Sequence, residues 1–365
     1  MTNKSCRFGI LGTAGIARKN WEAIRLAQGT EVVAVASRNL DSASRFINEC
    51  MAEVPFASSP EPIGSYQDLL SRDDIDAVYI PLPTAMRYEW VIKAAEAGKH
   101  VIGEKPAALN AQQVSEMLKA CEKNNVQYMD GVMFMHSQRL PMVRSLLDDG
   151  AVGRLRRMSS QFSFAGDKEF QSSNIRTNNH LEPHGCLGDL GWYCIRYFLW
   201  VMGGKLPSRV SAHTLTTLQG SGGDQPVPGE FTADLHFDGG VSASFYCSFL
   251  TENQQFVYLS GDKGYLRVDD FVLPYAGPEV AAYVGQDKFD ANNCKFHMEN
   301  HLTRHSVREY DSNHPTSQES QMISNFAAMV QSGKLDPAWP KWTLDTQRVL
   351  DACFESAQSG NPISL

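Results

Sequence analysis

The sequence lacks the features that mark several large classes of protein. No apolar run is long enough to span a bilayer, which takes about 20 consecutive apolar residues. The N-terminal residues run directly into an apolar strand pattern, without the longer hydrophobic core and the cleavage site of a signal peptide. Low-complexity tracts and blocks of like charge, which are typical of disordered tails, are also missing. We therefore expect a globular protein that is folded nearly end to end.

Cysteine patterns that would indicate a disulfide framework are missing as well. The eight cysteines are scattered and form no Cys-x-x-Cys pair, so reduced thiols and a cytoplasmic location are expected. The net charge of −8 disfavours a broad phosphate-binding surface, but it is compatible with one small anionic ligand in a basic pocket. The expected partner is therefore a small-molecule substrate, and neither nucleic acid nor a membrane is expected to bind.

The sequence does contain a regular alternation of short β-branched runs and helical patterns. Strands are predicted at 7–11, 31–37, 75–80 and 100–103, and helices at 16–26, 42–50, 88–97 and 114–124. This order is typical of an α/β domain with a doubly wound parallel sheet. Because 365 residues exceed the usual size of one core, two domains are expected, with bounds 1–130 and 131–365.

The pattern changes after residue 131. Helical stretches come first, and longer alternating segments at 230–237, 240–249 and 255–260 then indicate an antiparallel or mixed sheet. Helices are predicted at 319–330 and 344–358. The stretch 276–316 has weak periodicity and is predicted to be loop.

A glycine-rich turn follows the first predicted strand and opens a helix, which is the context of a dinucleotide-binding fingerprint. Gly12 stands at the tight turn, Ala14 where the backbone approaches a pyrophosphate, and Ala17 where the helix packs on the sheet. The two alanines replace glycines of the motif and add one methyl group each. A glycine-rich turn that binds nothing is the alternative. The predicted pyrophosphate-binding residues are Gly12, Thr13, Ala14, Gly15 and Ile16.

The second predicted strand ends at Ser37 and Arg38, where NAD-binding proteins place an acidic residue for the ribose 2′-hydroxyl. An acid there would repel a 2′-phosphate, whereas a hydroxyl and a guanidinium can donate hydrogen bonds to it. The sequence therefore predicts NADP as the cofactor. A solvated arginine at a helix start is the alternative for Arg38.

Two further segments carry side chains suited to proton transfer. Lys105 follows the predicted strand 100–103 and emerges at the carboxyl end of the sheet, where ligands of α/β proteins bind. Asp189 and Tyr193 stand four residues apart in a segment predicted to be a loop that enters a helix, so they share one face. A surface lysine, a helix cap and a half-buried tyrosine are the structural alternatives.

Together these motifs resemble the glucose-fructose oxidoreductase/inositol dehydrogenase (Gfo/Idh/MocA) family over essentially the whole chain, and within it the dihydrodiol/D-xylose 1-dehydrogenase branch. The resemblance rests on residues 9–17, 37–38, 80–84, 104–106 and 185–193. It implies a large, mostly antiparallel open sheet in the second domain and a homodimer formed through the exposed face of that sheet. It also implies that Lys105 and Tyr193 are the catalytic pair, that Asp189 assists them, and that the Lys105–Pro106 bond is cis.

The resemblance implies further site residues. The implied cofactor contacts beyond the fingerprint are Pro81, Leu82, Pro83, Glu104 and Lys105. The implied substrate residues are His136, Arg139, Arg176, His184 and Tyr193. A structural role is the alternative for His136, Arg139 and Arg176. Two positions depart from the family pattern, since His184 replaces a glycine before the 185–193 motif and Arg87 replaces a histidine after the Pro-Thr turn. The sugar specificity of the family is therefore not carried over.

The chemistry that follows is hydride transfer between NADP and a sugar-like hemiacetal, a polyol or a small carbonyl compound. Tyr193 is the expected proton acceptor. Free tyrosine has a pKa near ~10, and a lysine ammonium about 4 Å away at an effective dielectric of ~20 stabilises the phenolate by ~4 kcal/mol. Desolvation opposes part of that effect. The alternatives are a redox-neutral epimerase or cyclase that recycles its nicotinamide, and a catalytically silent NADP-binding regulator.

One other spacing suggests a metal site. His297, His301 and His305 recur every four residues, which on a helix would align three imidazoles. The stretch lies in the poorly periodic region and lacks a motif such as His-Glu-x-x-His, so no metal is expected. Cys186 and Cys194 flank the 185–193 motif and are expected to pack in the interior.

Overall fold

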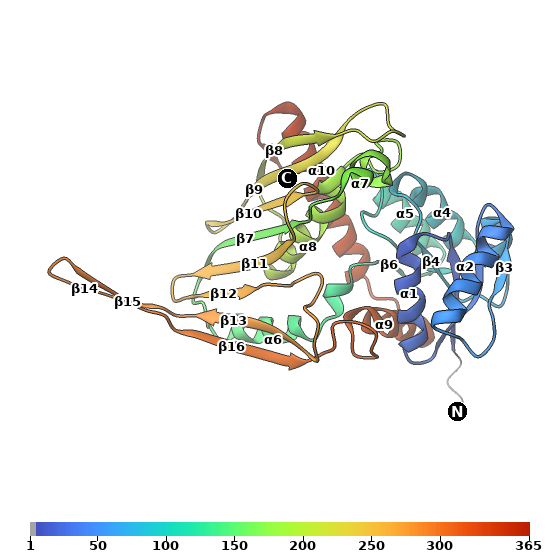
Figure 1. Ribbon diagram of the computed structural model, residues 1–365, viewed down its shortest axis with the longest axis horizontal. Coiled ribbons are helices and arrows are strands. Elements are labelled where there is room, and N and C mark those ends of the chain that lie inside the picture. Colours follow the sequence, from blue (N-terminus) through green and yellow to red (C-terminus); the bar gives the residue numbers. More distant parts are fainter. Residues whose placement is uncertain (1–4) are drawn as a thin grey trace. The chain divides into compact units, whose positions relative to one another are not determined.

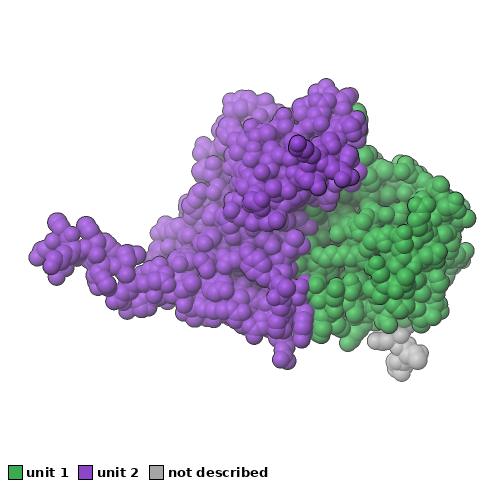
Figure 2. Space-filling model, viewed as in Figure 1, with its two compact units in different colours: residues 1–136, 180–182, 312–347 green, residues 137–179, 183–311, 348–365 purple. Residues whose placement is uncertain are grey.

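The computed structural model describes residues 5–365, which form two compact units (Figure 2). Unit 1 contains the chain up to His136 together with 180–182 and 312–347. Unit 2 contains 137–179, 183–311 and 348–365. The domain boundary expected at residue 130 stays a prediction, and the unit with the parallel sheet also takes up the later segment 312–347.

Unit 1 is built on a six-stranded parallel sheet in the order β3-β2-β1-β4-β5-β6. The chain that forms these strands is drawn in blue to teal in Figure 1. This order is that of a doubly wound dinucleotide-binding sheet. All residues of β4 are buried, as expected for a parallel strand that is covered on both faces. The predicted Rossmann architecture is confirmed. The strands are β1 (Cys6–Leu11), β2 (Thr30–Ala36), β3 (Glu61–Ile63), β4 (Ala77–Ile80), β5 (His100–Gly103) and β6 (Tyr128–Asp130).

The helices of unit 1 cross over between these strands, and a C-terminal segment joins them. Helix α9 packs on the sheet through Phe326, whose ring centroid lies 6.1 Å from that of Phe8 in β1. The helices are α1 (Gly15–Leu26), α2 (Leu40–Glu53), α3 (Tyr66–Leu70), α4 (Thr84–Glu96), α5 (Ala111–Lys123), the 3-10 turn η1 (Met133–His136), α9 (Gln318–Ser332) and the first part of α10 (Ala338–Ser359).

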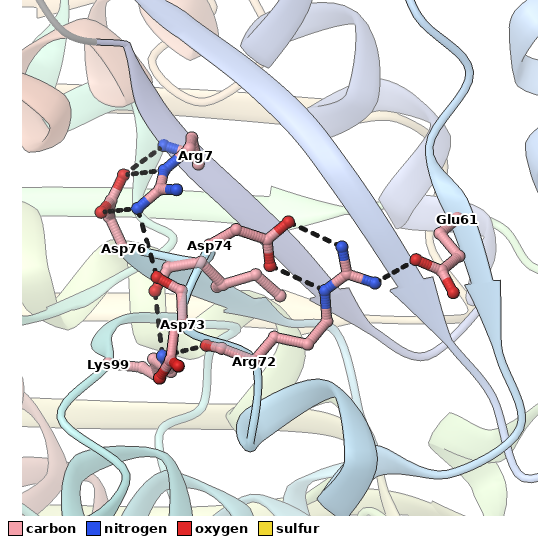
Figure 3. A network of polar contacts seen from close by, with 8 residues as sticks. Arg7, Glu61, Arg72, Asp73, Asp74, Asp76 and Lys99 are labelled. Atoms are coloured by element: carbon pink, nitrogen blue, oxygen red, sulfur yellow. Dashed lines mark hydrogen bonds and ion pairs between the residues drawn. The ribbon is translucent and has the colours of Figure 1, made fainter.

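Charged side chains gather at the amino ends of the parallel strands (Figure 3). Arg7 holds Asp76 through two side-chain hydrogen bonds of 2.9 and 2.8 Å. Arg72 holds Asp74 in the same two-pronged way, at 2.8 and 2.7 Å, and also pairs with Glu61 of β3. Because ligands of doubly wound sheets bind at the carboxyl ends of the strands, we assign this network a structural role.

Unit 2 is built on a nine-stranded sheet in the order β16-β13-β12-β11-β7-β10-β9-β8-β17. The β7–β10 pair is parallel and the other pairs are antiparallel, so the predicted large, mostly antiparallel sheet is confirmed. The strands are β7 (Leu155–Ser163), β8 (Arg209–Leu218), β9 (Val227–Phe237), β10 (Val241–Ser248), β11 (Gln254–Gly261), β12 (Tyr265–Val268), β13 (Glu279–Gly285), β16 (Leu302–Arg308) and β17 (Ile363–Ser364).

Helix α8 (Trp192–Val201) is the most deeply buried helix of unit 2, with every residue except Trp200 in the interior. Alternate residues of the strands are buried as well, which leaves the opposite face of the sheet half-exposed. The other helical elements are α6 (Arg139–Asp148), α7 (Lys168–Ser173), the 3-10 turn η2 (Ile175–Thr177), the π-helical turn η3 (Leu187–Gly191) and the rest of α10.

The prediction that residues 276–316 form a loop is wrong. This stretch contains β13, β16 and a separate two-stranded sheet of β14 (Lys288–Asn292) and β15 (Lys295–Glu299). Within β14 and β15 the sequence does alternate polar and apolar residues. The Asn293–Cys294 turn that connects them, however, lacks the glycine that usually marks a hairpin.

The three regularly spaced histidines lie on and beside these strands. His297 is in β15, His305 is in β16, and His301 lies between the two strands, so the helical alignment that their spacing suggests does not form. Over residues 5–365, no three His, Cys, Asp or Glu side chains are arranged to hold a metal ion. In the same part of the chain, no helix has the length and apolar content needed to cross a membrane.

Candidate functional site

The turn after β1 requires glycine at its first position. Gly12 has a φ of +118°, which side chains rarely adopt, and its amide donates to the Ala36 carbonyl of β2 at 2.8 Å. A methyl group at Gly12 would also lie 3.0 Å from Leu82 Cδ2. The turn therefore runs close against the two neighbouring strand ends, as the predicted fingerprint requires.

Helix α1 begins without any side-chain cap. Ala14 is its N-cap in an extended conformation, and the first turn contains no acidic residue. The space around Gly15 is open, since a methyl group there would meet no heavy atom within 4 Å. Thr13 is half-buried and Ile16 is exposed beside it. The unpaired amides of such a helix start attract an anion, so the segment fits a pyrophosphate.

The end of β2 presents the predicted phosphate-binding pair. Ser37 is half-buried, with its amide donating to the Ile63 carbonyl at 3.0 Å, and Arg38 is exposed next to it. Burial raises the pKa of Tyr66, and the neighbouring Arg38 guanidinium partly opposes that rise. Tyr66 in turn packs edge-on against Trp90 at 4.9 Å. The Tyr66–Trp90 pair thus helps to position the Arg38 side chain, and part of that side chain stays accessible to a ligand.

Arg87 connects two segments of the candidate cofactor site. Its Nε donates to the Leu82 carbonyl at 2.7 Å, and its Nη1 donates to the Pro106 carbonyl. The guanidinium is almost fully buried, and its Nη2 lies 3.7 Å from a carboxylate oxygen of Glu182. One side chain therefore joins the Pro81–Pro83 turn to the loop that carries Lys105.

Glu182 supplies the cap that α4 cannot make for itself. The N-cap of α4 is Pro83, which offers no side-chain acceptor. The Glu182 carboxylate accepts from the Thr84 amide at 2.9 Å and from the Thr84 hydroxyl. Glu182 is not among the predicted site residues, because it lies far along the chain from the helix that it caps. A proline N-cap is the local sign that an outside acceptor is needed.

Lys105 follows a buried polar chain at the end of β5. Asn20 donates to the Tyr79 hydroxyl at 2.7 Å, and that hydroxyl donates to Glu104 Oε1 at 2.6 Å. Burial and the adjacent Glu104 carboxylate raise the pKa of Tyr79 well above its usual value. The Lys105–Pro106 bond is cis, as the resemblance implies. Lys105 itself is half-buried. The residue before it, Glu104, and the carbonyl of the residue after it, Pro106, are both held by hydrogen bonds.

The segment 185–193 is helical throughout, where a loop entering a helix was predicted, and the π-helical turn Leu187–Gly191 leads into α8. π-Turns widen a helix and are frequent at functional sites. Gly185 has a φ of +47°, and a methyl group there would lie 2.2 Å from the Pro228 carbonyl oxygen. A side chain at Gly185 would therefore collide with the Pro228 backbone, so this position requires glycine.

Three of the predicted residues lie close together in unit 2. Asp189, in the π-turn, accepts an ion-paired contact from Arg176 Nε at 2.7 Å, and both side chains reach the surface. Tyr193 is the second residue of α8 and is 6% exposed. Its ring packs edge-on against Phe162 of β7 at 5.7 Å. The segment thus presents a positioned phenol and a carboxylate–guanidinium pair.

Two residues implied as substrate contacts lie in the interior. The His136 ring stacks on Trp339 with centroids 4.5 Å apart and planes 11° apart, and its Nδ1 bonds with Asn325 at 3.1 Å. The Arg139 guanidinium pairs with the Asp270 carboxylate and also donates to the Asp270 carbonyl at 2.8 Å. Both side chains are therefore held by protein groups.

His184, which departs from the family pattern, is also buried. Its ring packs edge-on against Phe354 at 5.0 Å, and burial lowers its pKa to about 4. His184 is therefore neutral at physiological pH. The remaining predicted pair is divided between the units, with Lys105 in unit 1 and Tyr193 in unit 2.

Comparison with known proteins identifies both parts of the chain. Residues 6–132 match the model described as oxidoreductase family, NAD-binding Rossmann fold, and residues 141–267 match the Gfo/Idh/MocA C-terminal domain. A dTDP-3,4-didehydro-2,6-dideoxy-α-D-glucose 3-reductase of Saccharopolyspora spinosa is 35% identical over 283 residues, which is 75% of this chain and 77% of that protein. D-xylose 1-dehydrogenase (NADP⁺) 2 of Haloferax volcanii is 29% identical over 98% of this chain and 99% of its own.

Solved structures agree with these matches. A 3-ketoreductase from Actinomadura kijaniata, in complex with NADP and TDP-benzene, has a TM-score of 0.80 and 27% identity over 97% of this chain and 98% of its own. A levoglucosan dehydrogenase has the same TM-score at 17% identity over 99% of both chains, which shows the shared fold. The family models, the long alignments and the two sheets lead to one assignment, and the chain belongs to the Gfo/Idh/MocA family of oxidoreductases.

Proposed function

We propose that this protein is an NADP-dependent oxidoreductase that transfers hydride between the nicotinamide and a carbinol or carbonyl carbon of a sugar-like substrate. Lys105 and Tyr193 are the proton-transfer pair in this proposal. The observation that supports it most is that the residues on both sides of Lys105 are held in place by buried hydrogen bonds. The buried Asn20–Tyr79–Glu104 chain precedes this lysine, and the carbonyl of the next residue, Pro106, is held by Arg87.

The cofactor assignment rests on residues of unit 1. The turn at Gly12 and the uncapped start of α1 fit a pyrophosphate. Ser37 and Arg38 stand where a 2′-phosphate would need donors, and Arg38 is exposed there. The Haloferax relative is named as an NADP⁺ enzyme and the Actinomadura structure contains NADP, which supports the same choice. When bound, NADP supplies or accepts the hydride.

The substrate class rests on unit 2 and on the relatives. The names of several relatives refer to sugars or sugar derivatives. In this chain the Arg176–Asp189 pair offers donors and acceptors to hydroxyl groups. In the proposal the Tyr193 oxygen accepts the substrate proton as tyrosinate in oxidation, and the Tyr193 hydroxyl donates a proton in reduction. The role proposed for Lys105 is to stabilise the tyrosinate form with its positive charge.

A screen of sugars, keto-sugars and polyols tests the proposal, with nicotinamide absorbance followed in both directions. On an identified substrate, Lys105→Met and Tyr193→Phe should each lower turnover by at least ~100-fold, the lower end of general acid–base catalysis. The double variant should resemble either single variant, because groups that act as a unit are not additive.

The matched control is Tyr258→Phe, which removes a hydroxyl from the half-exposed face of the sheet in β11. Its turnover should stay within about twofold of the wild type, the usual outcome for a surface substitution away from the site. Near-normal turnover of Tyr193→Phe would rule out the phenol as the proton-transfer group.

A further inference from the structure

Three residues of unit 1 come from the middle of the sequence of unit 2. Residues 180–182 belong to unit 1, although the chain before and after them belongs to unit 2. The Leu181 carbonyl accepts from the Ala85 amide at 3.1 Å. The Glu182 carboxylate accepts from the Thr84 amide at 2.9 Å and from the Thr84 hydroxyl. This anchor segment, residues 180–182, is thus attached to the first turn of α4 through both its backbone and a side chain.

Arg87 connects the anchor segment to the loop of Lys105. Its guanidinium is almost fully buried, and Nη2 lies 3.7 Å from a carboxylate oxygen of Glu182. Nη1 donates to the carbonyl of Pro106, the residue directly after Lys105, and Nε donates to the Leu82 carbonyl at 2.7 Å. A single side chain therefore holds both the anchor segment and the loop that carries the proposed catalytic lysine.

Arginine is the cationic side chain suited to these three contacts. A guanidinium has five N–H donors in a rigid planar arrangement, whereas an imidazole has two ring nitrogens and an ammonium acts as a point charge. Arg87 stands where the family pattern has a histidine. In this chain the departure is matched by Glu182, an acidic partner that a distant segment supplies. The two residues therefore form one unit rather than two separate changes.

The anchor segment also lies close along the chain to the second proposed catalytic residue. Tyr193 follows Glu182 by eleven residues. Pro183 has a backbone φ restricted by its ring, His184 is buried, and the segment 185–193 is helical throughout. The chain between the anchor segment and Tyr193 thus has little conformational freedom. What holds Glu182 therefore also restricts where the Tyr193 segment begins.

We propose that Glu182 and Arg87 are positioning residues for the reaction, which together hold the loop of Lys105 and the start of the Tyr193 segment in the arrangement that proton transfer requires. This inference rests on the proposed function. Neither residue touches the reacting atoms in it, since both act through the backbone groups that they hold. A displacement of 1 Å caused far from the chemistry can lower a rate by ~100-fold.

The pH dependence of kcat/KM tests this role, because a residue that only stabilises the fold does not shift it. Glu182→Gln keeps an acceptor for Thr84 and removes the charge that faces Arg87. On an identified substrate, this variant should lower turnover at least ~10-fold. It should raise the apparent pKa of the catalytic base by at least ~0.5, as expected when a positive charge moves from about 4 to about 5 Å from a phenolate at an effective dielectric of ~20.

A second variant reports on the same arrangement from the other partner. Arg87→Lys keeps the positive charge and lacks the planar set of donors, so it should raise the apparent pKa in the same direction. The double variant with Glu182→Gln should show a rise no larger than that of the stronger single variant, because the two residues act on one arrangement. Additive rises would contradict this coupling.

Asp76→Asn is the matched control. Asp76 is also half-buried, accepts from a backbone amide, that of Arg7, at 3.0 Å, and pairs with the Arg7 guanidinium. It lies at the amino ends of the parallel strands, away from where such sheets bind ligands, so the apparent pKa should stay within ~0.2 and turnover within about twofold of the wild type.

The reactivity of Lys105 tests the positioning without the enzymatic reaction. Modification of the full chain by trinitrobenzenesulfonate can be followed at each lysine by peptide mass spectrometry. The rate at Lys105 should change at least ~3-fold in Glu182→Gln and in Arg87→Lys, because the half-buried loop is no longer held. In Asp76→Asn it should match the wild-type rate.

The outcomes separate this inference from the proposed function. With Tyr193→Phe inactive, an unchanged pH profile or an unchanged Lys105 rate in Glu182→Gln would overturn the positioning role and leave the proposed function in place. If Tyr193→Phe keeps near-normal turnover while the Lys105 rate changes in Glu182→Gln and not in Asp76→Asn, the phenol is not the proton-transfer group and the positioning of Lys105 stands.

Discussion

Arg87 and Arg38 differ in how far their side chains are buried. Arg87 is buried and donates to carbonyls of two segments, whereas Arg38 is exposed beside Tyr66 with part of its surface open. A buried guanidinium with fixed partners holds the protein together, and an exposed one at the end of a strand can accept a ligand. The two arginines should therefore respond differently to substitution.

Replacing Arg87 by methionine should lower the free energy of unfolding by about 2–5 kcal/mol, because two buried carbonyls lose their donor and the Glu182 carboxylate loses its cationic partner. Denaturant titration measures this loss. Arg156→Met is the control, since Arg156 is half-exposed and lies 3.7 Å from Asp262 in a surface pair that should contribute no more than ~1 kcal/mol. A change at Arg87 as small as the control would contradict this role.

Replacing Arg38 by alanine should weaken NADP binding at least tenfold and leave NAD binding within about twofold. The reason is the loss of charge-assisted hydrogen bonds to the 2′-phosphate, which stabilise by ~1.5–3 kcal/mol. Calorimetric titration with both cofactors checks the result. Arg45→Ala is the control, because Arg45 is an exposed arginine of the helix that follows. Equal wild-type affinity for NADP and NAD would remove the basis of the cofactor assignment.

Secondary structure elements with strong local periodicity could be predicted, but their ends could not always be. The strand 100–103 has the predicted bounds. Helix α4 was expected from residue 88 and begins at Thr84, because its cap comes from Glu182, almost a hundred residues away. The π-turn lies where a loop entering a helix was expected, since its glycines favour irregular backbone unless they pack tightly, as Gly191 does against Leu187 and Phe245.

The residues of the candidate site could likewise be predicted only in part. Local motifs marked Gly12, Lys105 and the 185–193 segment, because each follows or opens a regular element. Spacing could not distinguish a residue that lines a pocket from one held in the interior, such as His136 on Trp339. Nor could it find Tyr79, whose role depends on contacts between three elements distant in sequence. Tertiary packing decides such cases.

The π-turn also leads to a prediction about Gly191. A methyl group there would lie 3.0 Å from Leu187 Cδ1 and 3.3 Å from Phe245 Cε2, both buried. Gly191→Ala should therefore destabilise the fold by ~1–3 kcal/mol and lower turnover through Tyr193, with NADP affinity within about twofold. Gly64→Ala is the control, since its methyl would make an ordinary contact of 3.6 Å with Leu40. An unchanged melting temperature for Gly191→Ala would contradict the packing.

For the whole molecule, burial of neutral His184 should make stability depend on pH. Its pKa falls from 6.5 to about 4 on folding, so the unfolded chain binds the proton first as pH falls. The stabilisation is fully present above pH 6.5 and is lost progressively toward pH 4. At 1.36 kcal/mol for each pKa unit, that loss is roughly 3 kcal/mol.

Unfolding titrations at several pH values from 7 to 4 test this expectation. His184→Leu should lose less stability than the wild type over the range, because the variant has no proton to bind at this position. His297→Ala, at an exposed position in β15, should follow the wild-type curve. Parallel curves for His184→Leu and the wild type would contradict the burial of a neutral imidazole.

The parallel pairing of β7 with β10 has a consequence for how the chain is made. Strand β7 is synthesised first, but its two neighbours in the sheet, β10 and β11, come much later in the sequence. At ~5–20 residues per second, the ribosome needs on the order of 4–15 s to pass from the end of β7 to the start of β10. During those seconds both edges of β7 have unpaired backbone groups. Strand β7 therefore cannot join its sheet until β10 or β11 has been synthesised, and its open edges are sites where the nascent chain can aggregate.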